Sequence, residues 1–110
     1  MTGSELVQEM KQNITLLDAA NASLPNRGRL FAKAEHDYSV AKSKEILIER
    51  ANGTPVTILL EIVKGKPEIA RLRMERDIAE RMYESCREAI NSYKLKIKII
   101  SGQIEREWKS

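Results

Sequence analysis

The sequence predicts an all-α protein, a long antiparallel helical hairpin of coiled-coil type with an N-terminal helix and a short apolar connector helix. Charged residues make up 32% of the 110 residues and aromatic residues only 5%, which favours a narrow apolar seam over a core of large rings. Apolar residues also recur at alternating spacings of three and four over two long segments. We expect one domain, residues 1–110, with helices at about 4–23, 29–51, 55–64 and 67–108.

The first helix is predicted over residues 4–23. Thr2 and Glu5 have the spacing of a capping box, in which each side chain bonds the other residue's backbone N–H. Pro25 disfavours helix at Leu24 and lacks an N–H of its own, so we expect the helix to stop before residues 24–28.

The second helix is predicted over residues 29–51. Phe31, Ala34, Tyr38 and further residues up to Ile48 repeat at spacings of three and four. Asn52-Gly53 is a typical C-terminal stop.

The connector helix is predicted over residues 55–64, with Thr54 as cap and Pro55 in the first turn. Its bulky and β-branched residues also suit a strand, but the sequence offers no partner strand. A helix-turn-helix interpretation is weak, because a recognition helix needs polar residues facing the groove. We expect a buried tip or a docking surface formed by Val56, Ile58, Leu59, Leu60, Ile62 and Val63.

The last helix is predicted over residues 67–108. Its heptad seam runs without proline through more than four repeats. The seam residues are Leu72, Arg76, Ala79, Tyr83, Cys86, Ile90, Tyr93, Ile97, Ile100 and Ile104.

The two long seams can be paired as an antiparallel hairpin. Setting Ile48 opposite Leu72 places Glu45 opposite Arg76, so these two charged seam residues are predicted to form a register pair. The first helix either extends this hairpin past Pro25 or folds back as a third bundle helix. Both arrangements leave a thin core, and we therefore expect a homo-oligomer, a dimer or larger.

Several functional classes are disfavoured by residue content. There is one cysteine and one histidine, which suits a reducing cytoplasm and cannot supply a His/Cys zinc site. No stretch has the length and apolarity of a membrane span. His36 stands beside Glu35 and Asp37 without a matching nucleophile, and Glu80, Glu84 and Glu88 alternate with arginines as on a solvated helix face. We expect no enzyme activity, no catalytic or metal-binding residues and no cofactor.

Nucleic-acid contact is conceivable, although an excess of three positive charges is far below that of a dedicated binder. The hairpin register would place Arg27 opposite Tyr93 and so gather basic residues from two helices. The candidates for phosphate contact are Arg27, Arg29, Lys33, Lys94 and Lys98.

The segments "AEHDYSVAKSKEIL", "GTPVTILL", "RLRMERDIAERMY" and "EREW" resemble small helical proteins encoded by phages and prophages of Gram-positive bacteria, over residues 31–108. The resemblance implies a role among early genes of DNA recombination and replication, and carries no functional residues. Our first hypothesis is a non-enzymatic, oligomeric accessory protein of phage DNA metabolism that docks onto an unknown protein partner in the cytoplasm of the bacterial host. The alternative is a phage-encoded inhibitor that occludes a host defence protein.

Overall fold

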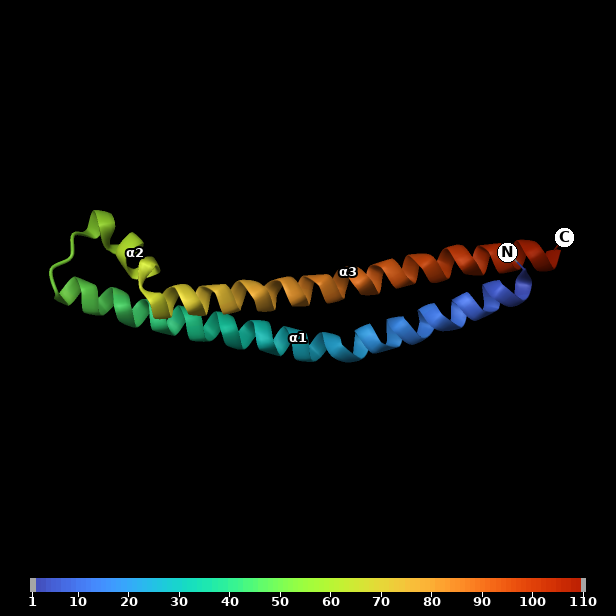
Figure 1. Ribbon diagram of the computed structural model, residues 1–110, viewed down its shortest axis with the longest axis horizontal. Coiled ribbons are helices and arrows are strands. Elements are labelled where there is room, and N and C mark those ends of the chain that lie inside the picture. The colour runs from blue at the N-terminus through green and yellow to red at the C-terminus, as the bar shows by residue number, and fades with distance from the viewer. Residues whose placement is uncertain (1, 110) are drawn as a thin grey trace. The chain divides into compact units, whose positions relative to one another are not determined.

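The computed structural model describes residues 2–109, which form three helices and no strand. They are α1 (Gly3–Ala51), α2 (Val56–Gly65) and α3 (Pro67–Lys109) (Figure 1). Helices α1 and α3 pair in opposite directions, so the predicted all-α helical hairpin is confirmed. The connector is also helical, as predicted.

The predicted break at residues 24–28 is wrong, because α1 runs without interruption through Pro25. A proline inside a helix removes one backbone hydrogen bond and crowds the preceding turn. Packing against α3 outweighs this local cost, since most helical stability in proteins comes from tertiary contacts. The N-terminal segment therefore continues the hairpin and does not fold back as a third bundle helix.

The described residues form two compact units, each containing a stretch of α1 and a stretch of α3. In the unit made by the residues up to Asn26 and those from Tyr83 onward, Leu6, Ile90 and Ile100 are buried. The capping box is confirmed there: Glu5 N–H donates to Thr2 Oγ1 at 3.2 Å, and Thr2 N–H donates to Glu5 Oε2 at 3.1 Å.

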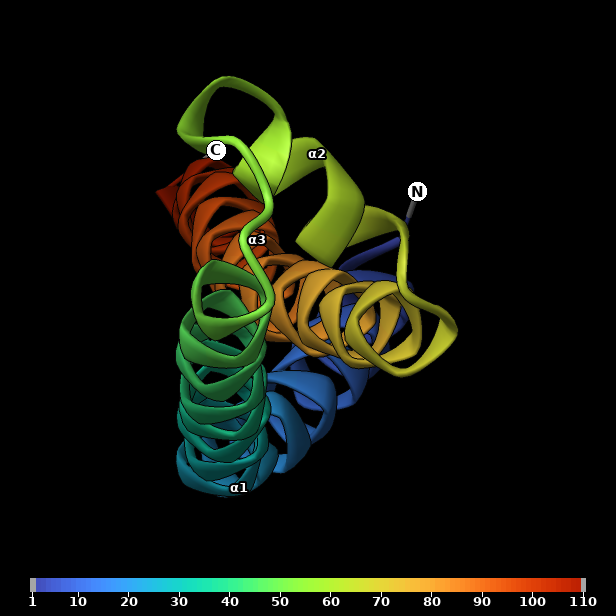
Figure 2. The same cartoon turned by 90° about the vertical axis from the view of Figure 1, so that its left-hand side faces the viewer.

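The second unit, Arg27–Met82, contains the connector helix. Both views show α2 folded back beside the end of α1 and the start of α3 (Figures 1 and 2). Its core joins all three helices through Tyr38, Leu59, Val63 and Ile69. Leu59 and Val63 were expected on a docking surface, but both are buried, because they are the face by which α2 packs onto the hairpin.

The predicted register is also wrong. In the second unit Arg27 donates to Met82 Sδ at 3.6 Å, and Arg76 Nε lies 3.5 Å from Glu35 Oε2. Relative to the predicted pairing, α3 is displaced by about ten residues, or roughly three turns. The reason is α2, which covers the last turns of α1. Helix α3 therefore begins opposite an earlier part of α1, nearer to its N-terminus.

The register pair Glu45–Arg76 is consequently not formed. Glu45 accepts a hydrogen bond from Lys66 at 2.6 Å. Arg76 donates to Asp77 at 2.8 Å, and its guanidinium stacks 4.7 Å from the centre of the Tyr38 ring.

Cys86 belongs to the first unit and shows the same displacement. Its thiol lies 3.3 Å from the backbone oxygen of Ala20 and 3.5 Å from Ser23 Oγ, whereas the pairing that sets Ile48 opposite Leu72 would place Ala34 opposite Cys86. The half-buried thiol is a hydrogen-bonded seam residue.

Candidate docking surfaces

Helix α2 presents two apolar ridges to solvent. One ridge is formed by Val56 and Leu60 and the other by Ile58 and Ile62, each pair spaced by four residues and therefore on one side of the helix. All four side chains are exposed, Val56 to 77%. The buried Leu59 and Val63 lie between the ridges on the inner side. We call the four exposed residues the α2 surface.

An ionic clamp holds both ends of α2 to the last turns of α1. Lys66 Nζ, just after α2, lies 2.6 Å from Glu45 Oε2 and 2.6 Å from Glu49 Oε1. Thr54, just before α2, donates from Oγ1 to Glu49 Oε2 at 2.6 Å. The clamp therefore fixes the direction in which the α2 surface points.

The clamp shifts the pKa values of two of its members. Hydrogen bonds to Glu45 and then Glu49 raise the pKa of Lys66. Hydrogen bonds from Lys66 and then Thr54 lower the pKa of Glu49. Both shifts favour the charged forms, so Lys66 and Glu49 are ionised at neutral pH.

A second apolar surface is a groove of about 310 Å³ between α1 and α3 in the unit Arg27–Met82. Its floor is formed by Leu30, Ala34, Ile78, Ala79 and Met82, and its charged rim by Arg27, Lys33, Asp37 and Glu75. Leu30, Ile78 and Met82 are each close to half exposed. An apolar floor with a polar rim is the usual anatomy of a protein interface.

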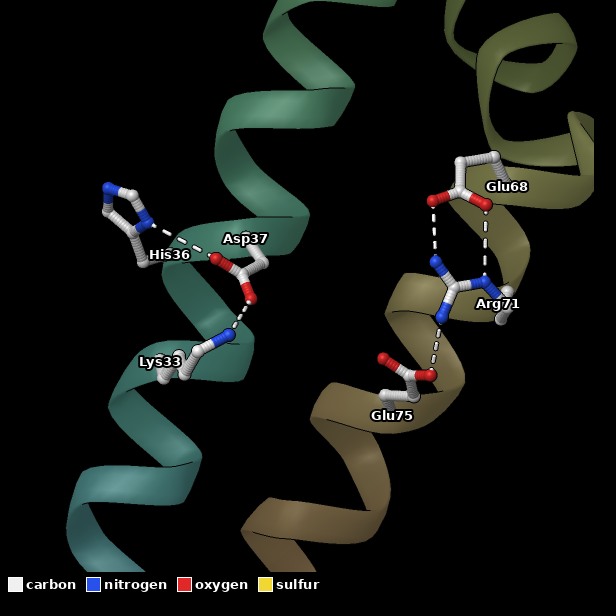
Figure 3. A network of polar contacts seen from close by, with 6 residues as sticks. All are labelled: Lys33, His36, Asp37, Glu68, Arg71 and Glu75. Atoms are coloured by element: carbon white, nitrogen blue, oxygen red, sulfur yellow. Dashed lines mark hydrogen bonds and ion pairs between the residues drawn. The ribbon is translucent and has the colours of Figure 1, made fainter.

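Three of the four rim charges, Lys33, Asp37 and Glu75, form ion pairs within their own helices (Figure 3). On α1, Lys33 Nζ lies 2.7 Å from Asp37 Oδ2, and the exposed His36 ring lies 3.5 Å from Asp37 Oδ1. The hydrogen bond from Lys33 lowers the pKa of Asp37. The rim on the α1 side is therefore charged at neutral pH.

On α3, Arg71 bridges two carboxylates. It donates to both oxygens of Glu68, at 2.6 and 3.1 Å, and to Glu75 at 2.6 Å (Figure 3). The hydrogen bonds from Arg71 lower the pKa of Glu68.

The residues predicted to contact nucleic acid are divided between the two units. Arg27 contacts Met82 and not Tyr93, and Lys33 is paired with Asp37. Arg29 is exposed in the same unit. Lys94 and Lys98 are exposed in the other unit. The predicted placement of Arg27 opposite Tyr93 depended on the register that the structure corrects.

The groove was not predicted from the sequence, although the sequence contains a signal for it. Leu30, Ile78 and Met82 each stand one position before a seam residue, namely Phe31, Ala79 and Tyr83. An apolar stripe wider than the heptad seam indicates a helix that packs against more than one neighbour.

Within residues 2–109 there is no group of three or more histidine, cysteine, aspartate or glutamate side chains arranged to hold a metal ion. No helix in this part of the chain has the length and apolarity needed to cross a membrane. Comparisons with protein-family models, curated proteins and solved structures find no match to the chain.

Proposed function

We propose that this protein is a non-enzymatic helical accessory protein that works by docking the α2 surface onto a protein partner. The observation that carries the proposal is the exposure of Val56, Ile58, Leu60 and Ile62 on a helix of ten residues. Full burial of a fully exposed side chain of this size contributes about 1.5–3 kcal/mol, and these four, which are 39–77% exposed, would each gain the corresponding part of that amount. A partner that covered both ridges would therefore have a substantial driving force for binding.

The mounting of α2 supports this role. Leu59 and Val63 anchor the helix in the core, and the Lys66–Glu45–Glu49 clamp fixes its ends. A surface held in place before binding loses little conformational freedom when the partner arrives. The two ridges suit a hydrophobic groove on the partner, in the manner of helix-in-groove recognition.

The partner class follows from the sequence resemblance to phage proteins of early DNA metabolism. We propose that α2 docks onto a replication or recombination protein of the same phage, in the cytoplasm of the bacterial host. Weak nucleic-acid contact through the exposed Arg29, Lys94 and Lys98 is a subsidiary part of the proposal. Such contact would be observed as binding to oligonucleotides with an affinity that falls steeply as the salt concentration rises.

The test places a charge on each ridge by Ile58→Asp and Leu60→Asp. Purified single-strand-binding and recombination proteins from the same genome serve as probes, with affinity measured by calorimetry. We expect the double variant to lose binding by a factor of about 30 or more, the effect of removing an interface hot spot. Its helicity should be unchanged, because both side chains are exposed.

The matched control is Val40→Asp with Met74→Asp, which places charges on two exposed apolar residues of the same unit that lie outside α2. These changes should leave the affinity within about twofold. Equal binding by the ridge variant and the wild type would overturn the proposal. Binding to a host defence protein and to none of the phage proteins would overturn the phage partner and support the inhibitor alternative.

A further inference from the structure

We infer that the groove of the unit Arg27–Met82 binds the same groove of a second copy of this chain. The two copies would be related by a two-fold axis and would run antiparallel, so that four helices share one core. This interface is separate from the α2 surface and does not depend on the proposed function.

The shape of the groove floor is self-complementary. Ala34 and Ala79, one on each helix, leave the floor low at its centre, while the longer Leu30, Ile78 and Met82 project beside them. In a two-fold interface the same patch serves both copies. The long side chains of one copy would pack over the alanines of the other, as knobs pack into holes in helical bundles.

The charges of the rim select the antiparallel direction. Arg27 lies at the Met82 end of the groove, whereas Asp37 and Glu75 lie toward the other end. Arg27 and Asp37 are about 15 Å apart along α1 at 1.5 Å per residue. A two-fold axis across the middle of the groove brings Arg27 of each copy to Asp37 and Glu75 of the other. A parallel pairing would instead place like charges together, which is unfavourable.

Arg27 is available for this contact. Its one hydrogen bond within the described chain is to the uncharged sulfur of Met82, and it makes no ion pair there. The carboxylates of Asp37 and Glu75 are 40% and 50% exposed although each has a cation on its own helix. A guanidinium from the second copy would therefore complete a network across the interface.

Sedimentation equilibrium of the full chain over a range of concentrations tests the inference, with two charge reversals. Arg27→Glu and Glu75→Arg each place like charges across the proposed interface, so each variant alone should dimerise at least about tenfold more weakly than the wild type. An equimolar mixture of the two variants restores opposite charges at both ends. We expect that mixture to recover dimers.

The mixture keeps the test meaningful if one variant is less stable, because recovery requires both folded copies. Glu88→Arg, an exposed change in the other unit, is the matched control and should dimerise as the wild type does. The inference would be overturned by a monomeric wild type at every concentration, or by dimers that both reversals leave unweakened. Absence of recovery in the mixture would also overturn it. The α2 ridge variants should remain dimeric, which separates this interface from the proposed function.

Discussion

At the scale of single residues, the ionic clamp around Lys66 determines how α2 is presented. Lys66 satisfies two carboxylates from successive turns of α1, and Thr54 bonds one of them. Replacing Lys66 by Gln would leave Glu45 and Glu49 facing each other without a cation. We therefore expect Lys66→Gln to lower the thermal unfolding temperature at neutral pH.

The pH dependence of this difference follows from the pKa shifts. The lowered pKa of Glu49 contributes stability above its ordinary value of 4.5, lost as the pH falls through the folded value. The raised pKa of Lys66 contributes stability below its ordinary value of 10.5, lost as the pH rises through the folded value. The difference in unfolding temperature between the wild type and Lys66→Gln should thus be largest between pH 4.5 and pH 10.5 and should decrease outside this range. Thermal unfolding followed by circular dichroism at a series of pH values measures this difference.

Lys33→Gln is the control for the clamp, because it removes a cation from an exposed ion pair on a helix surface. Lys33 is 72% exposed and pairs only within α1. We expect no measurable change in unfolding temperature, since surface pairs contribute little. A decrease in unfolding temperature equal to that of Lys66→Gln would contradict the claim that the clamp stabilises the protein more than an exposed ion pair does.

Residue patterns predicted local features better than contacts between helices. The Thr2–Glu5 capping box was predictable because both partners lie within one turn. The partners of Glu45 and Arg76 were not, because they depend on which turns of α1 and α3 meet. Lys66 is closer to Glu45 in the sequence than Arg76 is. The two residues meet only because α2 folds back along α1.

At the scale of elements, Pro25 is the feature of α1 most at odds with its local surroundings. The helix continues through it although the missing N–H and the ring disfavour helix there. Pro25→Ala restores one backbone hydrogen bond and should stabilise the protein by up to about 3 kcal/mol. Urea unfolding followed by circular dichroism measures the change. Unchanged or reduced stability would show that packing in the native structure depends on the proline.

The bounds of α2 and α3 and the end of α1 were predictable from heptad spacing and stop signals, whereas the continuity of α1 through Pro25 and the register of the helices were not. A seam that repeats every seven residues offers similar apolar matches after a shift of a few turns. Helix α2 determines which register forms. Its Leu59 and Val63 are buried against the end of α1 and the start of α3. This burial depends on the tertiary arrangement and not on the seam.

At the scale of the whole molecule, the hairpin buries few large side chains and leaves apolar surface on the α2 surface and in the groove. Of the six residues predicted to form a buried tip or a docking surface, four are exposed, whereas Leu59 and Val63 are buried. The groove was not predicted, because the heptad seam accounted for only one stripe on each long helix. The exposed apolar residues of both surfaces are accessible to other chains, which is the basis of the proposed role as a docking protein.

The central claim is that the ridges of α2 contact a protein of phage DNA metabolism. Its most direct test is photo-crosslinking in infected cells, with benzoylphenylalanine placed at Leu60 on a ridge or at the exposed Val40 on α1, outside α2. We predict one dominant adduct from position 60, identified by mass spectrometry as a replication or recombination protein, and little from position 40. Equal labelling from both positions, or adducts at position 60 with host proteins alone, would contradict the claim.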